Sequence, residues 1–289
     1  MKLLFQPIND AHSIVELVFF LNFSSNLRKE DILGIKEIFN EKYKKFNKDT
    51  PVYKLEHKVK FNEEDTASID SKKTTFSGFE LESLDERGEL NWGLSLSENK
   101  FLVHCLNYSS WEVTLDETIG YISDVLEFLK DNDTLLISNF GLKYLDRFVY
   151  SENIEESKLV SLFNRENIFL AKNILESGDV WHSNTGWFED MPEDFIIENS
   201  YAFKCLNQLG VESKSNGKNN DIEEIIVSID HGCFLIPKKV IENDSKYGIE
   251  VKHISMGYIN KCFNFLHDKN KIVLKGLLSD SMSKRINLY

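Results

Sequence analysis

The chain has 289 residues, of which 42% are hydrophobic and 12% aromatic, and its formal net charge is −13 at pH 7. This composition excludes a disordered chain and predicts a folded protein with a substantial core. The acidic excess argues against nucleic acid as the main ligand, because gripping phosphates requires a surplus of Lys and Arg, and it fits a basic protein partner.

No segment reads as a targeting or membrane signal. Met1–Pro7 loses its apolar character after a few residues, and the longest apolar run, Ile14–Leu21, is interrupted by Glu16. Both are too short for a signal-peptide core or a membrane span, so we expect a cytoplasmic protein without membrane contact. The cysteines form no Cys-x-x-Cys motif and lie in apolar runs, which predicts buried free thiols in a reducing compartment. They are Cys105, Cys205, Cys233 and Cys262.

The first sixty residues predict a strand, a helix and a second strand. Ile14–Phe23 is almost continuously apolar, which is typical of a buried strand. Lys29–Phe46 repeats apolar residues at steps of three and four, which indicates an amphipathic helix, and Pro51 is expected to end it. Tyr53–Phe61 alternates strictly, which predicts a half-buried strand.

A loop, a short strand and a hairpin are expected next. Residues 62–71 are polar and acidic, as in a loop, and residues 76–81 suggest a short strand. Leu90–Leu96 alternates apolar with polar or small residues, and Phe101–Leu106 returns after a polar turn.

A helix and a long strand complete this region. Thr114 and Glu117 show the Thr-x-x-Glu pattern of a capping box ahead of a helical apolar repeat. In the strand Phe140–Tyr150, one face is apolar and Asp146 is its only charge. The resulting β-α-β-β-β-β-α-β order predicts an α+β fold, a mostly antiparallel sheet with helices packed on one face.

The polar, acidic segment Ser151–Lys158 favours a boundary between two such halves, residues 1–150 and 151–289. Tyr144–Arg147 and Ser228–His231 each carry an apolar–Asp–basic step, so the second half is read as a diverged repeat of the first. Here we expect strands at 168–175 and 201–211, a structured loop at 181–187, a flexible loop at 212–221, a strand at 225–229 and a helical region opened by Ser255.

One candidate chemistry is a metal-dependent nuclease. Asp230 is followed by the Glu-x-Lys step of Glu250 and Lys252, a combination in which carboxylates hold Mg²⁺ and the lysine steadies an attacking water. The Glu-x-Lys pattern also recurs by chance in so charged a chain. The alternative is that these residues simply lie at a solvent-exposed strand edge. We expect no resident metal and no cofactor.

Other catalytic patterns are weaker. Asp230-His231 and His267-Asp268 are adjacent pairs, and neighbours on a strand or helix point in different directions, which disfavours chelation of one ion. The chain has no Gly-x-Ser-x-Gly motif and neither of the common glycine-rich phosphate loops.

Large aromatic residues crowd the segment expected to form a loop, and such loops often carry recognition hot spots. The alternative is that the two tryptophans fill a gap between the halves. The candidate binding residues are Trp181, His182, Trp187 and Phe188.

Several short motifs together resemble a sporadically distributed, uncharacterised family of bacterial proteins. They are Ile14–Val18, Leu94–Phe101, Tyr108-Ser-Ser-Trp111-Glu112, Phe140–Arg147, Ile229-Asp230, Leu266–Asn270 and Leu277-Leu278. Lys143 stands where the resemblance leads us to expect Arg, and Asp146 where it leads us to expect Asn. The resemblance implies a bacterial, patchily inherited protein of the kind found on mobile gene islands, and it transfers no activity or catalytic residue.

These features favour a non-enzymatic function: a protein-interaction component of a bacterial mobile-island system, such as an immunity or antitoxin-like neutraliser or an antiphage-defence subunit, with a protein partner. The alternatives are the nuclease using Asp230, Glu250 and Lys252, and a small-ligand sensor with a pocket between the halves near Trp181 and Trp187.

Overall fold

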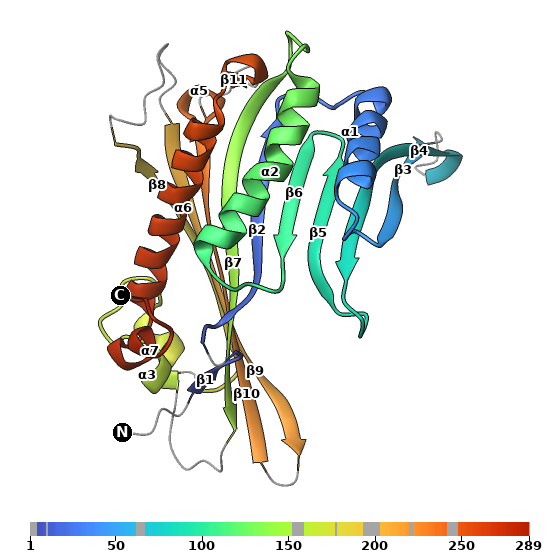
Figure 1. Cartoon of the computed structure of the whole chain (residues 1–289). Coiled ribbons are helices and arrows are strands. Elements are labelled where there is room, and N and C mark those ends of the chain that lie inside the picture. Colours follow the sequence, from blue (N-terminus) through green and yellow to red (C-terminus); the bar gives the residue numbers. More distant parts are fainter. Residues whose placement is uncertain are drawn as a thin grey trace.

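The structure, a computed structural model, describes residues 5–9, 11–61, 67–151, 159–176, 178–192, 203–219, 222–241 and 248–288. It contains helices and one large antiparallel sheet (Figure 1). The strands are β1 (Phe5–Pro7), β2 (Ile14–Phe23), β3 (Lys48–Phe61), β4 (Ala67–Leu84), β5 (Leu90–Ser97), β6 (Lys100–Cys105), β7 (Leu136–Ser151), β8 (Trp181–Asp190), β9 (Phe203–Asn219), β10 (Ile222–Pro237) and β11 (Ile249–Glu250). The helices are α1 (Lys29–Lys42), α2 (Trp111–Leu129), α3 (Leu159–Leu162), α4 (Lys172–Leu175), α5 (Lys238–Ile241), the 3₁₀ turn η2 (Val251–His253), α6 (Met256–Leu277) and α7 (Asp280–Arg285).

Strand β7 has the most partners in the sheet, which has 11 strands among the described residues and the order β3-β4-β5-β6-β2-β7-β10-β9-β8. It pairs with β2 on one side and β10 on the other, and the short strands β1 and β11 also pair with it. The sheet therefore continues from the first 150 residues into the rest of the chain. The expected boundary falls at residues 152–158, outside the described residues, so the division into two halves stays a prediction.

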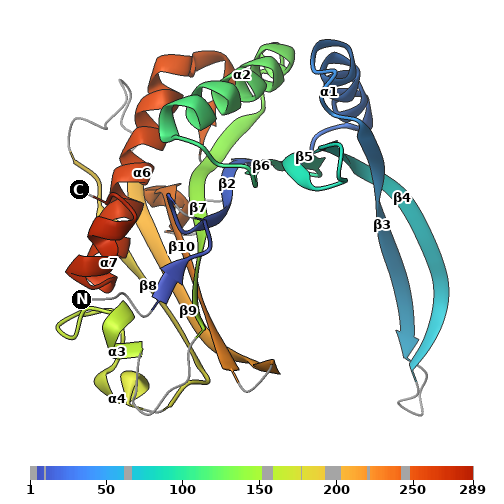
Figure 2. The ribbon, with the colours of Figure 1, turned by 60° about the horizontal axis from the view of Figure 1, so that its bottom comes forward.

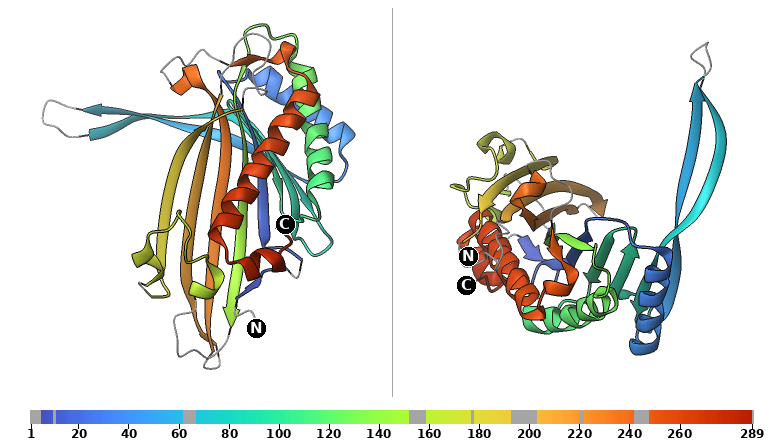
Figure 3. Two further views of the ribbon diagram at one scale, coloured as in Figure 1. Left: turned by 90° about the vertical axis from the view of Figure 1, so that its left-hand side faces the viewer. Right: turned by 90° about the horizontal axis from the view of Figure 1, so that it is seen from above.

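Helices α1, α2 and α6 cover one face of the sheet, as Figures 1 and 3 show. The apolar row expected on β7 is buried against them, and its neighbours on β2, β6 and β10 point the same way. The order β2-α1-β3-β4-β5-β6-α2-β7 confirms the order predicted for the first half, and β2 has the predicted bounds. Ser255 caps α6, as expected from the sequence.

The long hairpin of β3 and β4 projects from the body of the protein (Figures 2 and 3). Helix α1 ends at Lys42, and Pro51 lies inside β3, so the prediction that Pro51 ends this helix was wrong. Proline is tolerated there because β3 is an edge strand. Tyr53 and Leu55 are 57% and 55% exposed, so the described part of this strand is not half-buried as predicted.

Several local predictions were wrong because a short pattern pointed to the wrong element. Helix α2 begins at Trp111 after the cap Ser110, which accepts a hydrogen bond from the backbone N–H of Val113, so Thr114 and Glu117 lie inside the helix. The strand expected at 168–175 is a turn followed by α4. Of the loop expected at 212–221, the residues up to Asn219 belong to β9, and their backbone groups pair with β10.

Candidate functional site

Asp146 is the one carboxylate in the buried row of β7, and it lies under helix α6. Its side chain is 1% exposed. Oδ1 accepts a hydrogen bond from the Ser13 hydroxyl at 2.5 Å, and Oδ2 lies 2.7 Å from Nε2 of His231 on β10. Burial of a carboxylate is costly unless it is paired and hydrogen-bonded, and these two contacts provide that pairing.

The second nitrogen of His231 fixes where its hydrogen lies. Nδ1 is 3.0 Å from Oδ1 of Asn270 on α6, and the Asn270 amide nitrogen donates to the carbonyl oxygens of Leu142 and Leu266. Because the amide nitrogen faces two acceptors, its oxygen must face His231, and Nδ1 must carry a hydrogen. A further proton then lies between Nε2 and Oδ2, since two lone pairs would otherwise face each other in a buried site.

This arrangement is not that of an activated serine. The Ser13 hydroxyl donates to Asp146 and not to a histidine nitrogen, so the contact differs from the serine–histidine pair of a catalytic triad. The Ser13–Asp146–His231–Asn270 network instead holds β7, β10 and α6 together and gives the site a rigid polar floor.

Aromatic rings form the adjoining wall. The Trp111 indole stacks on His267 at 4.1 Å on one side and on Phe19 at 5.8 Å on the other. Nδ1 of His267 lies 2.6 Å from the Tyr144 hydroxyl, and the Tyr144 ring stacks on His231. Burial, helped by the nearby Lys271 ammonium, lowers the pKa of His267 to about 4, and burial raises the pKa of Tyr144 well above its ordinary value. At neutral pH, His267 is therefore an uncharged imidazole and Tyr144 a neutral phenol, and the two are hydrogen-bonded to each other.

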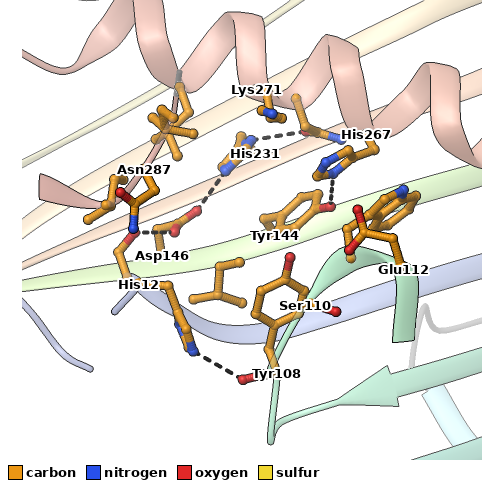
Figure 4. A pocket seen from close by; sticks show the side chains of 17 residues that line it. His12, Tyr108, Ser110, Glu112, Tyr144, Asp146, His231, His267, Lys271 and Asn287 are labelled. Atoms are coloured by element: carbon orange, nitrogen blue, oxygen red, sulfur yellow. Dashed lines mark hydrogen bonds and ion pairs between the residues drawn. The ribbon is translucent and has the colours of Figure 1, made fainter. Parts of the chain in front are cut away.

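These groups border a cavity of about 280 Å³ (Figure 4). Its lining comes from segments far apart in the sequence: 12–14, 108–112, 144–146, 231, 267–274 and 286–288. Polar, aromatic and aliphatic side chains all contribute. A concave site with a few convergent polar groups on an apolar surround is the usual form of a small-ligand site.

His12 also lines this cavity. Its Nε2 lies 3.1 Å from the carbonyl oxygen of Tyr108, which can only accept, so Nε2 carries the hydrogen and Nδ1 the lone pair. Nδ1 is buried and has no hydrogen-bond partner among the described residues. Tyr108 lines the same cavity, and burial raises the pKa of its hydroxyl to about 12, so this group is a donor at neutral pH.

Of the predicted nuclease residues, Glu250 and Lys252 form an ion pair at 3.5 Å, whereas Asp230 lies far from Glu250. Asp230 is paired with Leu145 of β7 and Glu250 with Leu136, nine residues further along the strand, which is roughly 30 Å at about 3.4 Å a residue. Asp230 binds Lys143 at 2.7 Å on the sheet face opposite His231, whereas Lys252 binds Asp133 at 2.9 Å. Across the described residues, no group of three or more His, Cys, Asp or Glu side chains is placed to hold a metal ion.

The predicted aromatic binding residues lie on the edge strand β8 and not in a loop. The Trp181 ring packs near Phe163, and the Trp187 ring stacks on Phe169 at 5.3 Å. Both rings pack against a cluster of buried apolar side chains that includes Phe163. His182 and Phe188 point outward, Phe188 being 49% exposed. A separate cavity of about 390 Å³ adjoins Trp187, but its described lining comes only from residues 168–273.

Sequence reasoning missed most of the central cavity. The signal that existed was Asp146, a single charge in an otherwise apolar strand face, because such a residue needs a buried partner. Residues of four motifs that carry the family resemblance meet at this cavity, among them Ile14, Trp111, Tyr144 and His267. His12 and Ser13 carried no comparable pattern.

Comparison with models of known protein families gives no match to this chain, and comparison with curated proteins gives none either. The resemblance to a sporadic bacterial family therefore stays a prediction.

Among the described residues, no helix is long and apolar enough to cross a membrane.

Proposed function

We propose that the protein is a small-ligand sensor whose ligand occupies the cavity beneath α6. The observation that carries this proposal is the cavity itself, with a rigid polar floor at Asp146 and His231 and an aromatic wall beside it. A concave site with a few convergent polar groups is the usual form of a small-ligand site.

The position of the cavity supports a role in sensing. Its lining combines residues 12–146 with residues 231–288, so a bound ligand would touch both of the predicted halves. A ligand that binds the folded chain and not the unfolded chain would stabilise the folded state by RT ln(1 + [L]/Kd), where [L] is the free ligand concentration. The third alternative drawn from the sequence, a pocket between the halves, thus becomes the leading proposal, with its site moved away from Trp181.

The experiment is a thermal-shift screen with small metabolites of neutral, cationic, anionic and zwitterionic character. Ile14→Trp places a large ring in the cavity wall, whereas Val113→Trp adds the same ring at a residue that is 59% exposed and outside the lining. We expect at least one compound to raise the melting temperature of the wild type and Val113→Trp but not of folded Ile14→Trp. If no compound does so, or if Ile14→Trp responds equally, the proposal fails.

A second proposed function is the non-enzymatic protein-interaction component of a bacterial mobile-island system, acting in the cytoplasm. The observation that favours it is the projecting β3–β4 hairpin, which exposes Tyr53 and Leu55 beside an unpaired strand edge. Exposed aromatic and aliphatic residues of this kind are typical anchors of interfaces. The net charge of −13 fits a basic partner, as expected for a neutralised toxin.

A pull-down from the native host tests this second function. The double variant Tyr53→Ser, Leu55→Ser should lose a stoichiometric protein partner, whereas Val180→Ser, which alters an equally exposed apolar residue elsewhere, should keep it. A bait that retains no protein, or a partner retained equally by both variants, would contradict the role of the hairpin.

A further inference from the structure

Two side chains of opposite charge, Glu112 and Lys271, line the central cavity. Glu112 is exposed in the first turn of α2, and Lys271 is half-buried on α6; both line the cavity (Figure 4). Neither makes an ion pair with a residue that the structure describes. The gap between them is therefore wider than a direct salt bridge.

Both charges nevertheless act on one ring. After burial, the Lys271 ammonium is the main influence that lowers the pKa of His267, and the Glu112 carboxylate opposes it. Glu112, Lys271 and His267 all line the cavity, Glu112 from α2 and the other two from α6 (Figure 4). A ligand seated against His267 would meet a positive group and a negative group together.

The rest of the cavity limits the size and polarity of such a ligand. A volume of about 280 Å³ lies just below the range of roughly 300–1,000 Å³ that holds drug-sized molecules. Ile14, Leu274 and Ile286 give part of the lining an aliphatic surface. A small molecule with a charged end and an apolar end matches these walls.

We propose that the cavity takes a small zwitterion, a free α-amino acid with an apolar side chain. Its ammonium group binds Glu112, its carboxylate binds Lys271, and its side chain lies against Ile14 and Leu274. A lone anion would face the carboxylate of Glu112 and a lone cation the ammonium of Lys271, so only a ligand with both charges pairs each of them. This inference rests on the proposed sensor function and specifies its ligand.

Titration calorimetry with the twenty free amino acids tests the inference, with the amide and the N-acetyl derivative of the best binder as probes that each lack one charge. We expect an apolar amino acid to bind, and each derivative to bind at least about tenfold more weakly, because each loses one charge-assisted contact. Lys271→Met and Glu112→Gln should each weaken binding of the free amino acid by a similar factor. Lys271→Met should no longer distinguish the amino acid from its amide, and Glu112→Gln should no longer distinguish it from its N-acetyl derivative.

Matched controls lie on the same helices. Lys261→Met on α6 and Asp116→Asn on α2 remove exposed charges outside the lining and should leave affinity unchanged. If the derivatives bind as well as the amino acid, or if only other compounds of the thermal-shift screen bind, the zwitterion assignment falls while the sensor function stands. If nothing binds in either experiment, both fall.

Discussion

His231 and Asp146 meet across two neighbouring strands as diagonal neighbours. In the pairing of β10 with β7, Asp146 stands opposite Ile229 and His231 opposite Tyr144, yet Nε2 of His231 reaches Oδ2 of Asp146 at 2.7 Å. Diagonal contacts of this kind are within reach of long side chains on one face of a sheet. The contact is buried, with the two side chains 3% and 1% exposed.

The cost of changing Asp146 should depend on what replaces it. Asp146→Ala leaves the Ser13 hydroxyl and Nε2 of His231 without partners, and breaking a buried pair in this way costs about 3–5 kcal/mol. Asp146→Asn, the residue that the family resemblance leads us to expect, can accept from Ser13 and donate to a neutral His231. It should cost about 1 kcal/mol or less. Urea denaturation of the two variants at pH 7 measures the difference, and equal losses would contradict the proposed network.

Trp111 should control the environment of His267. The indole is 8% exposed, lies between Phe19 and His267, and donates from Nε1 to Asn264 at 2.8 Å. Trp111→Ala should remove about 3–5 kcal/mol of stability, the usual cost of truncating a large buried aromatic residue. It should also return the pKa of His267 toward its ordinary value, because water would reach the ring. Histidine-selective NMR titration checks this, and an unchanged pKa in folded Trp111→Ala would contradict it.

The depressed pKa of His267 makes stability depend on pH in a predictable direction. Its folded pKa of about 4 lies below the ordinary value of 6.5, because burial disfavours the charged ring. Between these values the unfolded chain binds a proton that the folded chain does not, so the free energy of unfolding falls as the pH is lowered from about 6.5 to about 4. The loss from this group amounts to at most about 3 kcal/mol.

His267→Gln isolates that contribution because glutamine does not titrate. Denaturation curves across pH 4–7 should show a shallower decline for the variant than for the wild type. Carboxylates titrate at the lower end of this window in both proteins, so the difference between the two curves reports His267. Parallel curves would show that the imidazole is no more buried in the folded protein than in the unfolded chain.

Much of the first half was predictable because its elements carry long periodic patterns. An almost continuous apolar run predicts the strand Ile14–Phe23, and apolar alternation predicts the first strand of the hairpin Leu90–Cys105 and the buried row of β7. Helix α6 was equally clear, since its apolar repeat runs over six turns behind a serine cap. The four cysteines are buried and free, as their apolar surroundings predicted.

The site was less predictable because it depends on pairing across long sequence distances. Ser13 and Asp146 are 133 positions apart in the sequence, and no short-range sequence pattern predicts the hydrogen bond between them. Parts of β8 and β9 were predicted as loops because their sequences there are polar. These parts belong to the sheet through backbone pairing, which a hydrophobic pattern does not report. Closeness in sequence also does not ensure closeness in the fold, since Asp230 and Glu250 pair with residues of β7 that are nine positions apart.

Gly141 allows two phenylalanine rings to meet across the central strand. A Cβ added there would lie 2.3 Å from Cδ1 of Phe234 and 3.2 Å from Cβ of Phe20, and these two rings contact each other edge to face at 5.4 Å. Gly141→Ala must therefore displace the pair and should destabilise the fold by about 1–3 kcal/mol, the usual cost of overpacking. Gly120→Ala is the matched control: inside α2 its Cβ would meet only the Tyr43 hydroxyl oxygen at 3.8 Å, so the better helix propensity of alanine should add about 0.5–1 kcal/mol. Urea denaturation should thus move the two midpoints in opposite directions, and a shift of the same sign in both variants would contradict the close packing at Gly141.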